Sequence, residues 1–122
     1  MASHIIMSND NGASTLSKSA APDFEALDFA GWRGRAVEDS GLFMFMFDIA
    51  PDAVEFPIHA DKAEWLALVI SGSGTLYAGT ADLQKTDGMQ YEAGDYITFQ
   101  AGTPHGWKNA GEPSRILFVK RS

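Results

Sequence analysis

The sequence contains no cysteine among its 122 residues. This absence excludes disulfide bonds, catalysis by a thiolate, and zinc sites that are built on cysteine ligands. A chain without thiols tolerates oxidising and reducing compartments alike, and we expect this protein in the cytoplasm.

Long apolar runs are also missing, and none approaches the roughly 20 residues that a membrane-spanning helix needs. The apolar stretch at residues 4–7 is too short for the core of a signal peptide, and the polar residues 8–11 follow it at once. We therefore expect neither a secretion signal nor a membrane partner.

Positive charge is scarce: nine Lys and Arg face sixteen Asp and Glu, which leaves a net charge of −7 and a pI near 4.7. An acidic surface repels phosphate backbones, so the composition argues against a nucleic-acid partner. A small-molecule ligand or substrate is the partner class that we expect.

The length suits one domain with one core, and 45% hydrophobic residues argue against a disordered chain. Residues 1–20 are rich in Ser, Asn and Ala and show no periodicity, which predicts a mobile N-terminal arm. Packing of Ile5 and Ile6 on a partner would hold this arm in place. Residues 21–122 are predicted to form the single folded domain.

Turn signals recur roughly every eight to twelve residues after position 31, a spacing typical of many short strands. Only residues 23–27 have the composition for one helical turn, and no longer amphipathic helix is predicted. We expect an all-β fold, and a double-sheet jelly roll is the architecture that protects the edges of such strands. The run 42–47 is too apolar for a solvated strand, so we expect it to be covered on both faces or to lie in a homodimer interface.

The sharpest motif lies at residues 94–109, and it resembles the second sequence motif of the cupin family. Gly94, Gly102, His105 and Asn109 occupy the family's conserved places, whereas Gln100 stands where the family has Pro. Residues 57–72 resemble the first cupin motif, with His59 and Gly72 in place. Two departures occur there.

Those departures affect ligands. Asp61 stands where the first motif has its second His, and Trp65 stands where it has Glu. The resemblance implies a β-barrel that in most members holds one divalent metal on three His and one Glu. Cupins include oxygenases, isomerases, decarboxylases, lyases, sugar-binding regulators and storage proteins, so the resemblance implies the fold much more than the reaction.

Strand alternation places His59 and Asp61 on the same face, and only a folded sheet brings His105 to them. Imidazole and carboxylate groups suit a divalent Zn, Fe, Mn or Ni ion, so His59, Asp61 and His105 are candidate metal ligands. The alternative is that the two histidines are hydrogen-bonded in a barrel that holds no metal.

Glu64 leaves two geometries open. A β-bulge between Asp61 and Trp65 would turn Glu64 inward as the fourth ligand and leave Trp65 outside. A regular strand would instead place Trp65 in the cavity and Glu64 in solvent.

The sequence supports two functions. One is a metal-dependent enzyme of the oxygenase, isomerase or lyase type that acts on a small oxygen-bearing metabolite. The other is a non-catalytic barrel with a degenerate, metal-free site that binds or senses a small ligand. In either case Met44, Met46 and Met89 are candidates for filling a soft cavity.

Overall fold

The computed structural model describes residues 2–122, and within that range it consists of strands and loops without a helix. The twelve strands are β1 (Ser3–Asp10), β2 (Ala13–Ala20), β3 (Glu25–Ala26), β4 (Trp32–Asp39), β5 (Leu42–Ile49), β6 (Phe56–His59), β7 (Trp65–Ser71), β8 (Ser73–Gly79), β9 (Lys85–Glu92), β10 (Tyr96–Phe99), β11 (His105–Asn109) and β12 (Ser114–Arg121). The all-β prediction is confirmed. The helical turn considered for residues 23–27 is absent, because Glu25 and Ala26 pair with β4 instead.

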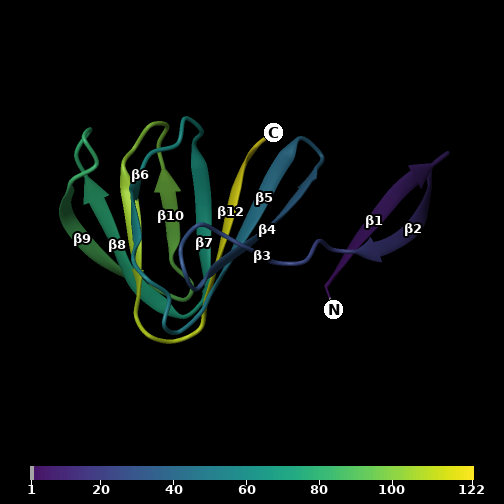
Figure 1. Ribbon diagram of the computed structural model, residues 1–122. Helices are drawn as coiled ribbons and strands as arrows, with labels where there is room; N and C mark the ends of the chain where they lie inside the picture. The colour runs from purple at the N-terminus through teal and green to yellow at the C-terminus, as the bar shows by residue number, and fades with distance from the viewer. Residues whose placement is uncertain (1) are drawn as a thin grey trace.

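Two antiparallel sheets form the barrel. One has the order β10-β7-β12-β5-β4-β3 and the other the order β6-β11-β8-β9. Figure 1 shows the sheets as the two walls of the barrel, with the four-stranded sheet at the left. Consecutive strands pair in β3–β4, β4–β5 and β8–β9, whereas the other neighbours in the two sheets are distant in sequence, as in a double-sheet jelly roll. This architecture is the one that the sequence predicted. No helix that could cross a membrane is found among residues 2–122.

Residues 3–20 form a hairpin that stands away from the barrel (Figure 1). Its turn is Asn11-Gly12, with positive φ at both residues, which is the geometry and the composition of a type I′ hairpin turn. The prediction of a mobile arm overlooked this signal, although Asn-Gly between strand-forming residues is readable from sequence. Its mobility relative to the barrel stays a prediction.

The barrel core follows from alternation along the strands. On β5, Phe47 and Ile49 are buried, whereas Leu42 and Met44 on the other face are 44% and 39% exposed. One face of the apolar run 42–47 therefore lines the barrel interior and the other lies on its outside. Trp32 and Trp107 are almost completely buried in the core.

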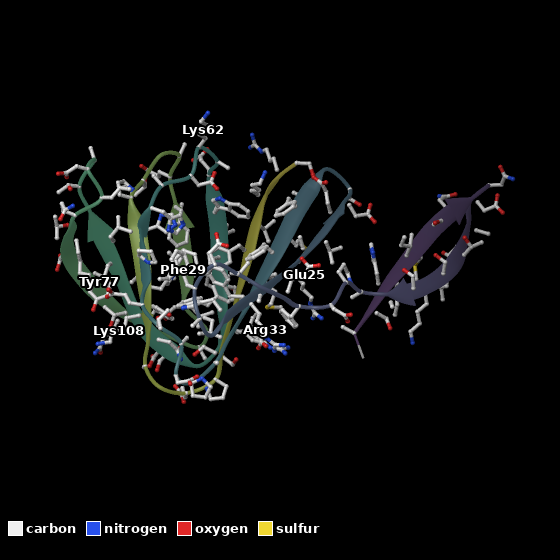
Figure 2. All side chains as sticks on the ribbon, in the orientation of Figure 1. Glu25, Phe29, Arg33, Lys62, Tyr77 and Lys108 are labelled. Carbon is white, nitrogen blue, oxygen red and sulfur yellow. The ribbon has the colours of Figure 1, made fainter. Side chains whose placement is uncertain are left out.

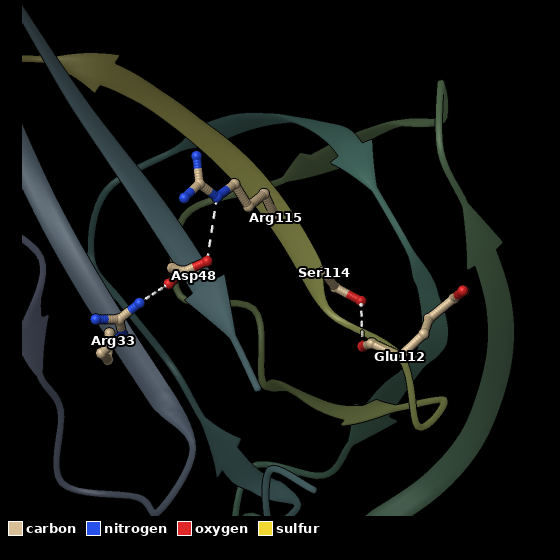
Figure 3. Close-up of polar contacts among 5 residues, drawn as sticks. All are labelled: Arg33, Asp48, Glu112, Ser114 and Arg115. Atoms are coloured by element: carbon tan, nitrogen blue, oxygen red, sulfur yellow. Dashed lines mark hydrogen bonds and ion pairs between the residues drawn. The ribbon is translucent and has the colours of Figure 1, made fainter. Parts of the chain in front are cut away.

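A charged cluster joins three neighbouring strands on the outer face (Figure 3). The carboxylate of Asp48 on β5 accepts hydrogen bonds from Arg33 on β4 and from Nε of Arg115 on β12, the latter at 3.1 Å. Partial burial acts to raise the pKa of Asp48, but the hydrogen bonds and charges of the two arginines outweigh it and lower the pKa below its usual value.

Candidate functional site

A cavity of about 430 Å³ lies between the two sheets, and aromatic rings make up most of its wall. The residues that line it are Ala26, Leu27, Asp28, Phe29, Phe43, Phe45, Phe47, Phe56, His59, Asp61, Trp65, Phe99, His105, Trp107 and Phe118. Figure 2 labels Phe29, one of these residues, among the side chains between the two sheets. The volume is within the range of small-molecule pockets.

Two histidines meet in this wall. His59 ends β6 and His105 begins β11, and the antiparallel register places their Cα atoms opposite each other. Their ring centroids are 4.5 Å apart. The predicted meeting of these two residues, 46 positions apart in sequence, is therefore present in the folded barrel.

Both imidazoles are oriented by the backbone. Nδ1 of His59 lies 3.1 Å from the carbonyl oxygen of Pro57, and Nδ1 of His105 lies 2.7 Å from that of Thr103. A carbonyl oxygen can only accept, so each Nδ1 carries the proton and each Nε2 is left for another partner. Both rings thus have the same tautomer when they are neutral.

Burial decides the charge of His105, whose exposed fraction is 7%. Desolvation lowers the pKa of His105 below its ordinary value, against the opposing effect of the hydrogen bond to Thr103. Near pH 7 this imidazole is consequently neutral, and its Nε2 carries a lone pair that can accept a hydrogen bond or bind a cation.

Asp61 lies at the edge of the same cavity but is solvent-exposed. Its Oδ1 accepts a hydrogen bond from the backbone amide of Ala63 at 2.8 Å, and its carbonyl oxygen accepts one from Gly102 at 2.7 Å. The residue therefore ties together the turn after β6 and the turn before β11. The carboxylate oxygen is engaged only within the turn after β6, and the backbone carbonyl makes the link to the turn before β11.

Trp65, and not Glu64, faces the cavity. Trp65 is the first residue of β7 and pairs in register with Phe99 on β10. Its ring meets those of Phe43 and Phe118 edge to face, with ring centroids 5.9 and 6.1 Å apart, respectively. Glu64 is exposed and does not line the cavity. Trp65 lines the cavity and Glu64 is exposed, as in the second geometry left open by the sequence, but no continuous strand places them there, because residues 60–64 form a loop between β6 and β7.

The donor set does not match a preassembled metal centre. Across residues 2–122, no group of three or more His, Cys, Asp or Glu side chains is arranged to hold an ion. His59 and His105 supply two nitrogen atoms, Asp61 is engaged in its turn, and an indole occupies the place of the fourth ligand. The geometry thus brings together two of the four predicted ligands, His59 and His105, leaves Asp61 at the rim, and leaves Glu64 outside.

Sequence reasoning missed the loop between β3 and β4. Asp28 and Phe29 reach the cavity from this loop, and the ring of Phe29 packs on Phe56 at 4.7 Å. No motif marks them. The alternating Phe43, Phe45 and Phe47 were a readable signal for an aromatic wall, since residues two apart on a strand share a face.

The methionines predicted to fill the cavity do not line it. Met44 and Met46 lie on the outer face of β5, and Met89 on β9 is 75% exposed. The prediction was wrong because the phenylalanines that alternate with Met44 and Met46 take the inward positions.

The remaining motif residues are structural. Gly94 and Gly102 have φ values of 96° and 72°, which side chains other than glycine rarely tolerate. Asn109 is buried, and its amide donates to the carbonyl oxygens of Ala50 and Glu112 while its Oδ1 accepts from the hydroxyl of Ser114. Of the four matched residues in this motif, only His105 lines the cavity.

Comparison with known proteins supports this description. The family model "Cupin domain" matches residues 45–120, more than half of the chain, whereas no curated protein matches significantly. A solved oxalate decarboxylase from Lactobacillus farciminis, in a formate complex, is 22% identical with a TM-score of 0.66 over 82% of this chain and 30% of that one.

Two smaller solved proteins align over most of both chains. The polyketide cyclase RemF from Streptomyces resistomycificus is 20% identical, with a TM-score of 0.67 over 81% of this chain and 72% of its own. KdgF from Halomonas sp. is 13% identical, with a TM-score of 0.67 over 82% and 87%. At these identities the structures agree in fold alone. The family match, the jelly-roll barrel and the motif residues together show that the chain belongs to the cupin family.

Proposed function

We propose that the barrel binds one small, largely apolar and oxygen-bearing molecule in the cavity between its sheets. The observation that carries this proposal is the composition of the cavity wall, in which aromatic rings surround a pair of backbone-oriented histidines. The rings favour a flat or aromatic ligand body, and the histidines favour a hydroxyl at one end.

The neutral His105 explains how such a hydroxyl is recognised. Its Nε2 accepts a hydrogen bond from the ligand, because Nδ1 already donates to Thr103. Should the barrel be an enzyme, the same nitrogen is placed to take a proton from the hydroxyl. A ligand without a hydroxyl would leave the lone pair unpaired in an apolar wall, at a cost of about 1 kcal/mol or more.

The second candidate is the metal-dependent enzyme that the sequence predicted, with a divalent ion on His59, His105 and Asp61. What favours it is that both Nδ1 atoms are held by carbonyl oxygens, as is usual for metal-ligating histidines. Against it stands the absence of a three-residue ligand group in the described chain. Glu64 is left out of this candidate because its side chain lies outside the cavity.

A small molecule, rather than nucleic acid or membrane, remains the partner that we propose, and the cytoplasm remains the proposed location. The similar fold of a protein named as a polyketide cyclase is compatible with an oxygen-bearing ligand.

Binding of 2-naphthol and of naphthalene tests the first candidate. Trp65 and Trp107 line the cavity, so quenching of tryptophan fluorescence reports its occupation. We expect 2-naphthol to bind several-fold more tightly than naphthalene, and we expect His105→Phe to remove most of that preference. Equal affinities in the original protein, or an unchanged preference in His105→Phe, would contradict the proposed role of His105.

Elemental analysis of protein purified without chelator tests the second candidate. A stoichiometric metal that is lost in both His59→Ala and His105→Ala, and reduced less in Asp61→Asn, would favour the metal-dependent enzyme. Protein without metal that still distinguishes the two probes would leave the binding function standing alone.

A further inference from the structure

Two tryptophans are almost completely buried in the barrel, and their indole N–H groups differ in hydrogen bonding. Trp32 is 1% exposed, and its Nε1 donates a hydrogen bond to the carbonyl oxygen of Val54 at 2.6 Å. Trp107 is 2% exposed, but its Nε1 has no hydrogen-bond partner among residues 2–122 and almost no contact with solvent. A buried indole N–H usually has a partner, because taking a polar group out of water without a new hydrogen bond is unfavourable. The unpaired N–H of Trp107 therefore needs a physical explanation.

Trp107 belongs to the wall of the cavity that holds the histidine pair. It lies on β11 two residues after His105, so strand alternation turns both side chains to the same face. The centroid of its ring is 4.8 Å from that of His105 and 5.5 Å from that of His59, and all three residues line the cavity. An indole with an unpaired donor thus lies beside an imidazole whose Nε2 carries a lone pair.

The other rings around Trp107 do not supply a strong acceptor. The rings of Phe47 and Phe56 have centroids 5.4 Å from it, and those of Phe99 and Phe118 have centroids 5.8 Å from it. A hydrocarbon ring accepts only a weak contact from an N–H group. Neither histidine is hydrogen-bonded to the indole nitrogen in the part of the chain that the structure describes. The acceptor that fits this N–H must therefore come from a molecule in the cavity.

We propose that the ligand of this cavity carries, in addition to the hydroxyl recognised by His105, a carbonyl oxygen that accepts a hydrogen bond from the indole N–H of Trp107. This inference rests on the proposed function, since it adds a second polar group to the same ligand. A neighbouring acceptor and donor on the protein match a neighbouring donor and acceptor on the ligand. The ligand class is therefore an aromatic hydroxy ketone and not a simple phenol.

Binding requires a small movement of the cavity wall. The indole nitrogen is covered by its neighbours in this structure, so the carbonyl oxygen reaches it only when side chains shift. Changes of side-chain rotamer on binding are common even where the backbone stays in place. The backbone of β11 is held on both sides, by β6 and by β8, so the movement is confined to side chains.

Two matched phenols test the inference by calorimetry. 3-Hydroxyacetophenone has its carbonyl in the meta position, where the hydroxyl cannot bond to it within the molecule, and 3-ethylphenol has a methylene group in place of that carbonyl. We expect the ketone to bind about fivefold more tightly, which is the factor that one net hydrogen bond gives. Trp107→Phe keeps an aromatic ring and removes the N–H, so this preference should disappear in the variant. A preference that persists in Trp107→Phe would overturn the inference.

Nuclear magnetic resonance of the original protein observes the N–H directly and needs no variant. The chain has three tryptophans, and the indole signal of Trp107 is assigned from its contacts with the neighbouring rings. We expect 3-hydroxyacetophenone to move this signal to lower field, and 3-ethylphenol to move it much less. The signal of Trp32 is the internal control, because its N–H is already bonded to Val54 and should stay in place.

The outcomes separate this inference from the proposed function. Equal affinity for the two phenols, without a specific shift of the Trp107 signal, would overturn the inference alone and would mean that the N–H packs against a ring face. If neither phenol binds, the proposed function fails and the inference fails with it.

Discussion

Trp65→Glu introduces a carboxylate into the cavity at the position where the cupin motif has a glutamate. Phe99 lies opposite Trp65 in the β7–β10 register, and its ring is 4.4 Å from that of His105, so the new group enters the neighbourhood of the histidine pair. We expect this variant to bind zinc or manganese more tightly than the original protein does, because it adds a third ligand to two oriented imidazoles.

The same substitution destabilises the protein when no metal is available. It removes the edge contacts of Trp65 with Phe43 and Phe118, each contributing about 0.5–1.5 kcal/mol. It also leaves a space and a carboxylate in an aromatic wall. Because Trp65 is only partly buried, we expect a total cost of about 2–4 kcal/mol rather than the upper values for a buried ring.

Metal would offset this cost by mass action. A ligand present at 100 times its Kd stabilises the native state by about 2.7 kcal/mol, comparable with the loss. Melting temperatures should thus fall by on the order of 10 °C in chelator and recover most of that in excess metal. The assay is thermal unfolding of the original protein and of the variant in both conditions.

Trp65→Gln is the matched control, since it creates the same space without the charge. It should be destabilised similarly in chelator and should gain little from metal. If neither the Glu variant, the Gln variant nor the original protein gains stability from excess metal, the histidine pair is not accessible to a cation from the cavity, and the metal-dependent candidate fails with it.

Three further predictions concern stability and pH. Because the pKa of His105 is lowered in the folded state, the unfolded chain takes up the proton first as pH falls below about 6.5, so acid should destabilise the original protein more than His105→Gln. Melting temperatures at pH 8 and pH 5 measure this, and an equal decrease in melting temperature for both proteins would contradict it. Asn109→Ala leaves buried partners including Ser114 unpaired and should cost about 2–3 kcal/mol in urea unfolding, whereas a cost below about 0.5 kcal/mol would refute this structural role. Burial raises the pKa of Tyr91 to about 12, so ultraviolet titration should show one of the three tyrosines ionising at higher pH than the others, and Tyr91→Phe should remove that phase. Ionisation of all three tyrosines at the same pH would be inconsistent with the burial of Tyr91.

The fold was largely predictable from local features of the sequence. Turn residues at regular intervals predict short strands, and the absence of a helical apolar stripe excludes the main alternative. Alternation also placed Trp65 on the same face as Ala67 and Val69, and both of the latter are buried in the core. The two cupin motifs predicted that His59 and His105 meet, which the register confirms.

Some of the missing information was present in the sequence but was not used. Asn11-Gly12 is a strong hairpin signal, and the alternating phenylalanines of β5 indicate an aromatic interior. Both are local patterns, and they were masked by the polar composition of the first twenty residues and by the methionines between the phenylalanines.

Only the tertiary structure decided what the site contains. Alternation states which residues share a face, but it cannot state whether Asp61 turns towards His105 or satisfies the amide of Ala63, because that depends on the path of the turn after β6. Alternation also cannot predict that Phe29 lines the cavity, because the loop of Phe29 reaches the cavity only when the two sheets have folded around it. The sequence by itself determined the barrel strands and the histidine pair, because they depend on local patterns and on a known motif. The missing third ligand and the aromatic cavity were decided by packing between segments that lie far apart in the chain.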